Sequence, residues 1–351
     1  LMAAVTGRPA LRAAVDEFNA IVSDNSTIIR QALLDHDRPD LFPEQCKLSR
    51  VVHRVASTKL EEELYLAGHW VEASVHASCR LRFSGSWMQA IPSIPRFRAK
   101  SHIYRIMLCL RFLAPIPGTE GLTSCPCGTN GHKHREGLRD GTHWISQCPS
   151  WSGRGRRHNG IARALRKLFK ELYWQVQDGE TAGWWPGRMH IRPFDVLALP
   201  KNFSQWLGLD VGVSDPTRIG ALPPSVSYNR KGASARRMAA RKSGDYRTVV
   251  RDHGQPSLTV RFEPFILEVY GGFSFGAIEL WKEWIKYASA EGIGVNYRSD
   301  QQQLVHGSHE STWSALSFSP YHAQNMSWQV VYSTAIGVFN GVQAAAAAQA
   351  A

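Results

Sequence analysis

The chain contains neither a long apolar run nor an excess of acidic residues, and both absences restrict what it can be. No stretch of eighteen consecutive apolar residues occurs, so the sequence predicts no membrane-spanning helix and no membrane partner. The chain begins with Leu, and its first residues lack a basic segment followed by an apolar run and a cleavage site, so we treat its start as arbitrary. Only 29 acidic residues oppose 41 lysines and arginines, which gives a net charge of +12. That balance favours a polyanionic partner, although a basic soluble domain without such a partner has the same charge.

Cysteine is also scarce, with six residues in a chain of 351. Cys46, Cys79 and Cys109 are isolated, whereas the other three share one short window with several histidines. This spacing disfavours a disulfide framework and is typical of a metal site in a reducing compartment. We therefore expect a nuclear or cytosolic protein.

The order of apolar patterns predicts four regions. Apolar residues recur three and four positions apart in residues 10 to 80, which is typical of amphipathic helices. A segment rich in Pro and Gly at 115 to 118 then indicates a boundary. We expect a helical linker region at 1–115, a cysteine-rich module at 116–150, an α/β core at 151–300, and a tail with one helix, from about Gln324, at 301–351.

Residues 151–300 predict an α/β fold in which a mixed sheet is flanked by helices. The expected strands lie near residues 194, 206 and 264, and the expected helices at about 156–176, 233–246 and 275–290. Strands that alternate with helices in this way form layered α/β cores.

The cysteine-rich window has the spacing of a zinc site. Cys125 and Cys127 are followed after fifteen residues by His143, and Cys148 comes after four more. Zinc prefers four nitrogen or sulfur ligands in a tetrahedron, and two close pairs joined by a loop supply them without a preformed core. We therefore predict a structural zinc ion held by these four residues, with no open position for water.

Two alternatives to this ligand set stay open. His132 and His134 lie in the loop between the two pairs, and either could replace His143. The cysteines could also be free thiols beside a basic loop.

The segment that follows the window, GRGRRHN, is basic. Positive side chains beside a zinc knuckle suit contacts with the phosphates of a nucleic acid. We expect such contacts from Arg154, Arg156, Arg157 and His158. A solvated charged surface is the competing explanation.

Two aspartates lie on consecutive predicted strands. Asp195 belongs to RPFDV, and Asp210 stands in the middle of LGLDVGV, with fourteen residues between them. Leucine and valine alternate around Asp210, so its side chain is expected on the opposite face, where Gly208 and Gly212 leave room for a metal or a phosphate. So sparse a carboxylate site suits Mg²⁺ or Mn²⁺, which keep waters and phosphate oxygens as further ligands. A single strand aspartate is usually structural, but two on one hairpin indicate a metal site.

Lys242 lies on the helix that follows these strands. It shares a helical face with Ala235, Met238 and Tyr246, which places it on the inner side of that helix. An ammonium group there would stabilise the negative charge that develops on a phosphate during hydrolysis. Several arginines surround it in the sequence, so a solvent-exposed cation is the alternative.

The order of these motifs resembles the C-terminal part of site-specific non-LTR retrotransposon polyproteins. The resemblance covers about residues 80 to 285 and rests on CPCG with a later His and Cys, then RHN, RPFDV, LGLDVGVSDP, GASARRMAARKSGDY and FEPFILEVYGG. In that family a CCHC zinc knuckle behind the reverse transcriptase precedes a restriction-enzyme-like endonuclease of the PD-(D/E)XK class. The resemblance implies a restriction-endonuclease-like core, target DNA and retroelement RNA as partners, an upstream reverse transcriptase region, and nuclear localisation.

The same resemblance assigns roles to individual residues. It implies that Asp195 and Asp210 are the metal-binding aspartates and that Lys242 is the catalytic lysine. It also aligns Glu268 with a family glutamate, which is either a further carboxylate of the catalytic site or a structural acceptor. One departure is Ala239, because the family often has a glutamate three residues before the lysine.

The sequence therefore predicts a Mg²⁺- or Mn²⁺-dependent DNA endonuclease module of a retroelement. Such a module nicks target DNA and leaves a 3′-hydroxyl that primes reverse transcription. The alternative, to which Ala239 points, is a catalytically decayed, zinc-dependent module that binds nucleic acid. A third possibility is a host protein that kept the fold for packing or for binding a partner.

Overall fold

The computed structural model describes residues 57, 59–90, 97–128, 137–178, 185, 191, 193–201, 203–217, 231–293 and 318–350. Its contacts divide the chain into two compact units, Leu1–Ala73 and Ser74–Ala351. The second unit holds the sheet and every site residue discussed below. The boundaries expected near residues 115, 150 and 300 fall inside this unit, so the cysteine-rich module, the α/β layers and the C-terminal helix share one compact body.

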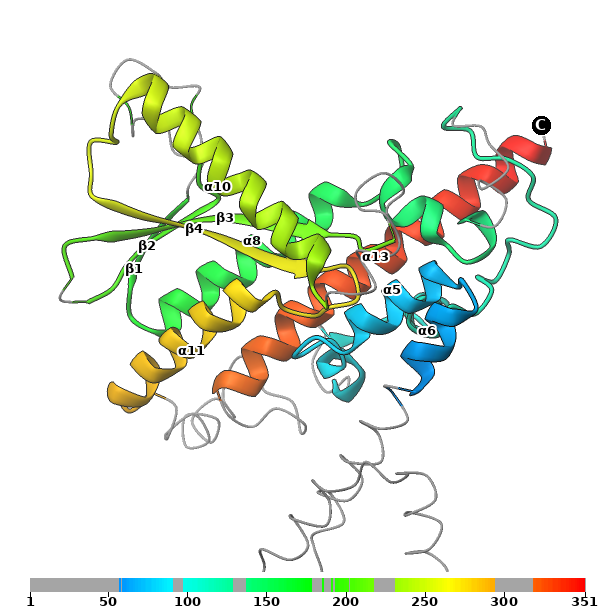
Figure 1. Ribbon diagram of the computed structural model, residues 1–351, viewed down its shortest axis with the longest axis horizontal. Coiled ribbons are helices and arrows are strands. Elements are labelled where there is room, and N and C mark those ends of the chain that lie inside the picture. The colour runs from blue at the N-terminus through cyan, green and yellow to red at the C-terminus, as the bar shows by residue number, and fades with distance from the viewer. Residues whose placement is uncertain are drawn as a thin grey trace, which may run out of the picture. The chain divides into compact units, whose positions relative to one another are not determined.

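The second unit contains a four-stranded mixed sheet (Figure 1). Its strands, in spatial order, are β1 (Gln175–Asp178), β2 (Val196–Leu199), β3 (Trp206–Ser214) and β4 (Val260–Glu268). β2 pairs antiparallel with β1 and with β3, whereas β3 and β4 pair parallel. A parallel pair needs a crossover connection, and α10 (Ala233–His253) lies within it. The sheet and its helices confirm the α/β class predicted from the sequence.

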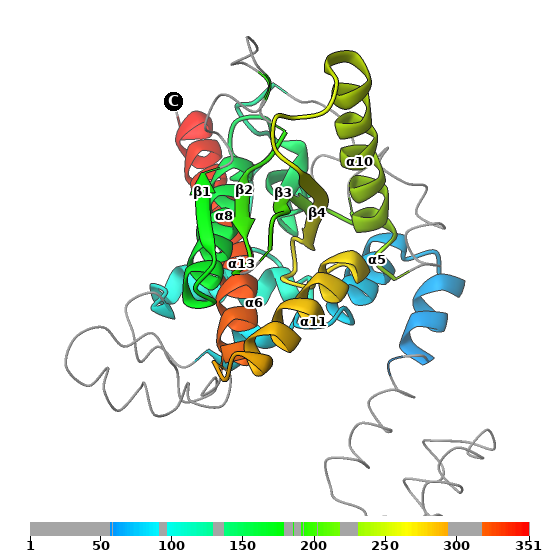
Figure 2. The same ribbon diagram turned by 90° about the vertical axis from the view of Figure 1, so that its left-hand side faces the viewer.

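Helices cover both faces of this sheet. α8 (Arg154–Glu171) and α11 (Phe275–Ala290) pack on one face, where buried leucines, phenylalanines and tryptophans form the largest core cluster. α10 lies on the opposite face, as two perpendicular views show (Figures 1 and 2). There Tyr246 of α10 stacks on Phe262 of β4, with 4.3 Å between the ring centroids.

The alternation of side chains along β3 separates the core from the candidate site. Leu209 and Val211 are at most 1% exposed and belong to the main core. Asp210 and Gly212 alternate with them and face α10. The predicted two-residue period of this strand is therefore confirmed.

α8 ends earlier than its apolar stripe predicts. The stripe continues to Val176, but α8 ends at Glu171 and Val176 lies in β1. Tyr173 adopts a left-handed backbone conformation, with φ of 57°, which breaks the helix. Trp174 then stacks on Phe169 with 5.0 Å between the ring centroids. Periodicity missed this turn because Val176 lies four positions after Leu172 and so continues the helical spacing of the stripe.

The C-terminal segment is a central helix rather than a tail. α13 (Phe318–Ala350) begins before the helix expected from about Gln324. By length and composition it is apolar enough to cross a membrane. In the structure it packs against α8, α6 (Ser101–Phe112), η1 (Ser86–Gln89) and η3 (His143–Gln147). Its buried residues occur on all sides, so no single apolar stripe marks it in the sequence.

Candidate functional site

The two predicted aspartates meet between β2 and β3. Asp195 immediately precedes β2, and its backbone N–H donates to the carbonyl of Leu209 at 2.8 Å. Its carboxylate accepts the backbone N–H of Val211 at 2.7 Å, and its carbonyl accepts from Arg166 at 2.9 Å. The two carboxyl groups also influence each other, because the charge of Asp195 raises the pKa of Asp210. The hairpin therefore brings both carboxyl groups to one point.

Lys242 joins this pair from α10. Its ammonium group forms an ion pair with the carboxylate of Asp210. The two side chains are only 17% and 23% exposed, so the pair is largely shielded from water. Lys242 thus points inward, on the helical face predicted from the sequence, and not into solvent with the neighbouring arginines.

His158 belongs to the same cluster, although the sequence analysis assigned it to phosphate binding. Its Nε2 lies 2.9 Å from Oδ2 of Asp195, which is 37 positions away in the chain. Its other ring nitrogen, Nδ1, lies 3.1 Å from Oδ1 of Asn159. The motif RHN contained this residue, but spacing within one helix does not indicate a contact with a distant strand.

Burial and neighbouring charges give the two carboxyl groups different proton affinities. Burial raises the pKa of Asp210 to about 6, although the Lys242 ammonium opposes that rise. Burial acts on Asp195 in the same direction, but the hydrogen bond from His158 brings the pKa of Asp195 below its usual value. The same bond raises the pKa of His158. Asp195 therefore ionises first as the pH rises, and Asp210 follows near pH 6, so a divalent ion competes for Asp210 with a proton below that pH and with Lys242 above it.

The four predicted zinc ligands form a second cluster. The ligand atoms of Cys125, Cys127, His143 and Cys148 all lie within 4.8 Å of one another. Sγ of Cys125 is 3.9 Å from Sγ of Cys148, and Sγ of Cys127 is 3.5 Å from Nε2 of His143. Separations of this size suit a tetrahedron whose zinc–ligand bonds are ~2.0–2.3 Å long. The set therefore fits one structural zinc ion.

The thiols of this cluster are held in a buried environment. Burial raises the pKa of Cys148 to about 12, and the nearby thiol of Cys125 adds to the rise. A bound cation is what allows such thiols to deprotonate near neutral pH. The alternative ligands His132 and His134 lie outside the described residues.

No protein-family model, curated protein or solved structure matches this chain. A function proposed for the two clusters therefore rests on their own residues and distances.

The arginines after the zinc cluster do not share one environment. Arg154 and Arg156 are exposed in the first turn of α8, where a phosphate can reach them. Arg157 is 2% exposed, and its guanidinium donates to the carbonyl of Ile145 at 2.9 Å. Its predicted phosphate contact is therefore corrected to an internal contact, because a buried guanidinium cannot reach a bound nucleic acid.

Glu268 belongs to neither cluster. It pairs in register with Ser214, four residues beyond Asp210, which corresponds to ~13 Å at ~3.3 Å per strand residue. Its carboxyl group is buried, and Oε2 has no hydrogen-bond partner among the described residues. The structure does not bring Glu268 to Asp195 and Asp210, so its placement in the catalytic site is corrected, and its role as a structural acceptor stays a prediction.

Replacing Glu268 with glutamine is expected to stabilise the protein at pH 8. Burial raises the pKa of Glu268 to about 7 from an ordinary value of 4.5. A carboxyl pKa raised by folding favours the folded state at low pH, and this contribution is lost as the pH rises from 4.5 to about 7. Glutamine removes the cost of the buried charge, on the order of 3 kcal/mol. In thermal unfolding, the melting temperature of Glu268→Gln should exceed that of the wild type at pH 8, and the difference should be smaller at pH 5. A lower melting temperature of the variant at pH 8 would contradict this account.

Gly212 makes room for Lys242, and filling that room is expected to disturb the site. A Cβ on Gly212 would lie 2.7 Å from Sδ of Met238 and 3.0 Å from Cε of Lys242. Overpacking of this kind costs ~1–3 kcal/mol, so Gly212→Ala should lower the free energy of unfolding by about 2 kcal/mol. Gly244→Ala on α10 is the matched control, because a Cβ there meets nothing within 4 Å. Urea unfolding measures the difference in free energy of unfolding between the two variants. Equal stability would show that a methyl group fits at position 212 without overpacking.

Proposed function

We propose that this chain is a metal-dependent DNA endonuclease module of a retroelement, which nicks target DNA to leave a 3′-hydroxyl that primes reverse transcription. The observation that carries the proposal is the convergence of Asp195, Asp210 and Lys242. These groups come from separate elements, and each has a task in the hydrolysis of a phosphodiester. The proposal also implies that the α/β fold is, more specifically, a restriction-endonuclease-like core.

The donor set at the paired aspartates suits Mg²⁺ or Mn²⁺. Mg²⁺ takes oxygen ligands and commonly binds one or two carboxylates, with waters and substrate phosphate oxygens at its other positions. Asp195 and Asp210 supply two carboxyl groups whose backbone is fixed by the pairing of β2 with β3. When bound, such an ion polarises the phosphate and lowers the pKa of the attacking water.

The side chains around the aspartates prepare the site for this reaction. Val211 and His158 both contact the Asp195 carboxylate, so it is already oriented before an ion binds. Lys242 places a positive charge where the phosphate oxygens would gain negative charge. In the reaction a water oxygen bonds to phosphorus, the bond from phosphorus to the 3′ oxygen breaks, and that oxygen takes up a proton. The products are a 5′-phosphate and a free 3′-hydroxyl.

Exposed positive charge close to the site supports DNA as the substrate. Arg154 and Arg156 lie within four residues of His158 at the start of α8. Contacts of this kind with phosphates supply affinity and orientation without reading the base sequence. The structural zinc cluster precedes this helix start and would present a compact surface to target DNA or to the element's RNA. The nucleus is the compartment in which such a target lies.

Nicking of supercoiled plasmid by the full chain tests the proposal. With Mg²⁺ or Mn²⁺, the wild type is expected to convert supercoiled DNA to the open-circular form, and a polymerase should extend the nick. Asp195→Ala and Asp210→Ala are expected to leave the DNA at the background level. Equal cutting by the wild type and both variants would overturn the proposal.

A catalytically decayed, zinc-dependent module that binds nucleic acid is the second candidate. Ala239 favours it, because α10 offers no carboxylate at the position where the endonucleases that this chain resembles often carry one. DNA binding by the zinc-loaded protein, without metal-dependent cleavage, would select this function.

A further inference from the structure

Two consecutive residues connect the zinc cluster with the paired aspartates. Arg157 donates to the carbonyl of Ile145, which lies in η3 between two zinc ligands. The next residue, His158, places Nε2 at 2.9 Å from Oδ2 of Asp195. Both residues belong to the first turns of α8, so one peptide unit separates the contact at one cluster from the contact at the other.

α13 holds the start of α8 from another side. The guanidinium of Arg157 also donates to Oγ1 of Thr334 at 3.5 Å. The segment just before α8 approaches α13 so closely that a Cβ on Gly337 would lie 2.8 Å from the carbonyl oxygen of Trp151. The start of α8 therefore cannot shift relative to η3 and α13 without breaking these contacts.

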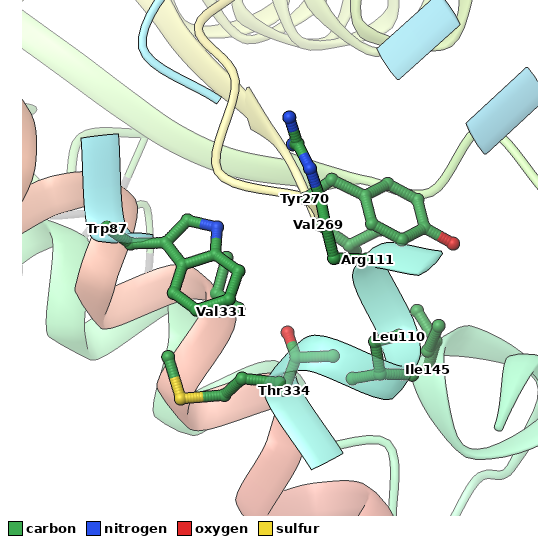
Figure 3. A pocket seen from close by; sticks show the side chains of 9 residues that line it. Trp87, Leu110, Arg111, Ile145, Val269, Tyr270, Val331 and Thr334 are labelled. Carbon is green, nitrogen blue, oxygen red and sulfur yellow. The ribbon is translucent and has the colours of Figure 1, made fainter. Parts of the chain in front are cut away.

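The space between these elements is almost filled. A cavity of about 10 Å³ is lined by side chains of η1, α6, η3 and α13 and of the segment after β4. Ile145 and Thr334 are among the lining side chains (Figure 3). A cavity of that size has room for about one water molecule. Because little empty space is available, a displacement of η3 is passed on to its neighbours rather than absorbed.

Burying Arg157 costs more free energy than burying an apolar side chain at the same position would. Its guanidinium is buried, and burial lowers the pKa of Arg157 to about 10. Its two hydrogen bonds go to a carbonyl and a hydroxyl, and the charge of Asp215 offsets only part of the cost of burying the cation. An apolar side chain of similar length would fill the space at a smaller cost in free energy. Unlike an apolar side chain, the guanidinium donates a hydrogen bond to the carbonyl of Ile145 in η3.

We propose that Arg157 is a positioning residue through which the zinc cluster fixes His158, and thereby Asp195, for binding a divalent ion. The inference rests on the proposed function, because it concerns the same metal site. In the zinc-loaded protein η3 presents the carbonyl of Ile145 at a fixed place, Arg157 binds it, and the first turns of α8 then aim His158 at Asp195. The nuclease site thus depends on the zinc cluster although the zinc ion takes no part in hydrolysis.

Mn²⁺ binding, followed by electron paramagnetic resonance, tests this role in three full-length, zinc-loaded proteins. They are the wild type, Arg157→Met, which keeps the length of the side chain without its donors, and Arg163→Met, which removes the same charge from an exposed position on the same helix. Arg157→Met is expected to keep one zinc per chain and a melting temperature close to that of the wild type, and to bind Mn²⁺ at least about tenfold more weakly, as lost outer-shell contacts usually do. The Arg163→Met control should match the wild type.

The outcomes distinguish this inference from the proposed function. If the wild type binds Mn²⁺ and zinc-loaded Arg157→Met binds it equally well, the positioning role is overturned while the nuclease proposal stands. If the wild type binds no Mn²⁺, the nuclease proposal fails, and the positioning role of Arg157 fails as well. If Arg157→Met does not fold, Arg157→Lys replaces it. That variant keeps the charge but not the planar pair of donors, so unchanged Mn²⁺ affinity in it would overturn the role in the same way.

Discussion

Replacing Lys242 with methionine is expected to slow nicking by about two to three orders of magnitude without weakening Mn²⁺ binding. The loss of rate follows because the variant lacks the charge that would stabilise the phosphate oxygens as the attack proceeds. The affinity of the variant for Mn²⁺ should equal or exceed that of the wild type, because the Lys242 ammonium pairs with the Asp210 carboxylate and competes with a divalent ion. Single-turnover nicking of supercoiled plasmid and titration with Mn²⁺ measure the two effects separately.

Arg241→Met is the matched control for this variant. Arg241 is adjacent in sequence but exposed on α10. Its loss should weaken DNA binding modestly and leave the single-turnover rate at saturating protein close to that of the wild type. If Lys242→Met nicks as fast as Arg241→Met, Lys242 is one more surface cation in functional terms, and its inward placement serves packing alone.

Replacing Cys148 with serine is expected to release zinc and to destabilise the unit Ser74–Ala351. Cys148 is buried, and its Sγ lies 3.9 Å from that of Cys125. Binding of a structural zinc ion contributes on the order of 10 kcal/mol in small zinc modules, and it is coupled to folding. A loss of even a few kcal/mol corresponds to a melting temperature lower by ~10 °C or more in a domain of this size. Elemental analysis should show zinc falling from one per chain to none, and calorimetry should show the lower melting temperature.

Cys109→Ser provides the control for the zinc prediction. Cys109 lies on α6, outside the cluster, and is partly buried. This variant should keep its zinc and melt close to the wild type. Full zinc occupancy in Cys148→Ser would instead mean that the ligand set differs, with His132 or His134 taking part.

Local patterns predicted those parts of the site that depend on spacing within one segment. The two-residue period of β3 placed Asp210 opposite the core, and the helical period of α10 placed Lys242 on its inner face. The pair spacing in the cysteine-rich window likewise predicted the four residues that the structure brings together as a possible metal site. In each case the geometry of one element or one loop determines the outcome.

Contacts between distant segments were not predictable in this way. A charge pattern treats Arg154 and Arg157 alike, whereas burial in the folded unit separates them. The contact of His158 with Asp195 depends on how α8 packs against the sheet, and the burial of Glu268 depends on where α10 begins. α13 was underestimated for a related reason, because a helix that is buried on all sides shows no stripe of polar and apolar faces.

Mn²⁺ binding to the zinc-loaded wild type, compared with Asp210→Asn, tests the central claim most directly, namely that Asp195 and Asp210 together hold one catalytic divalent ion. Asparagine keeps the size of the side chain and removes its charge, so packing beside Lys242 is preserved. The account predicts one bound Mn²⁺ per chain in the wild type and none at the same concentration in the variant. Equal binding of Mn²⁺ by the two proteins would contradict it.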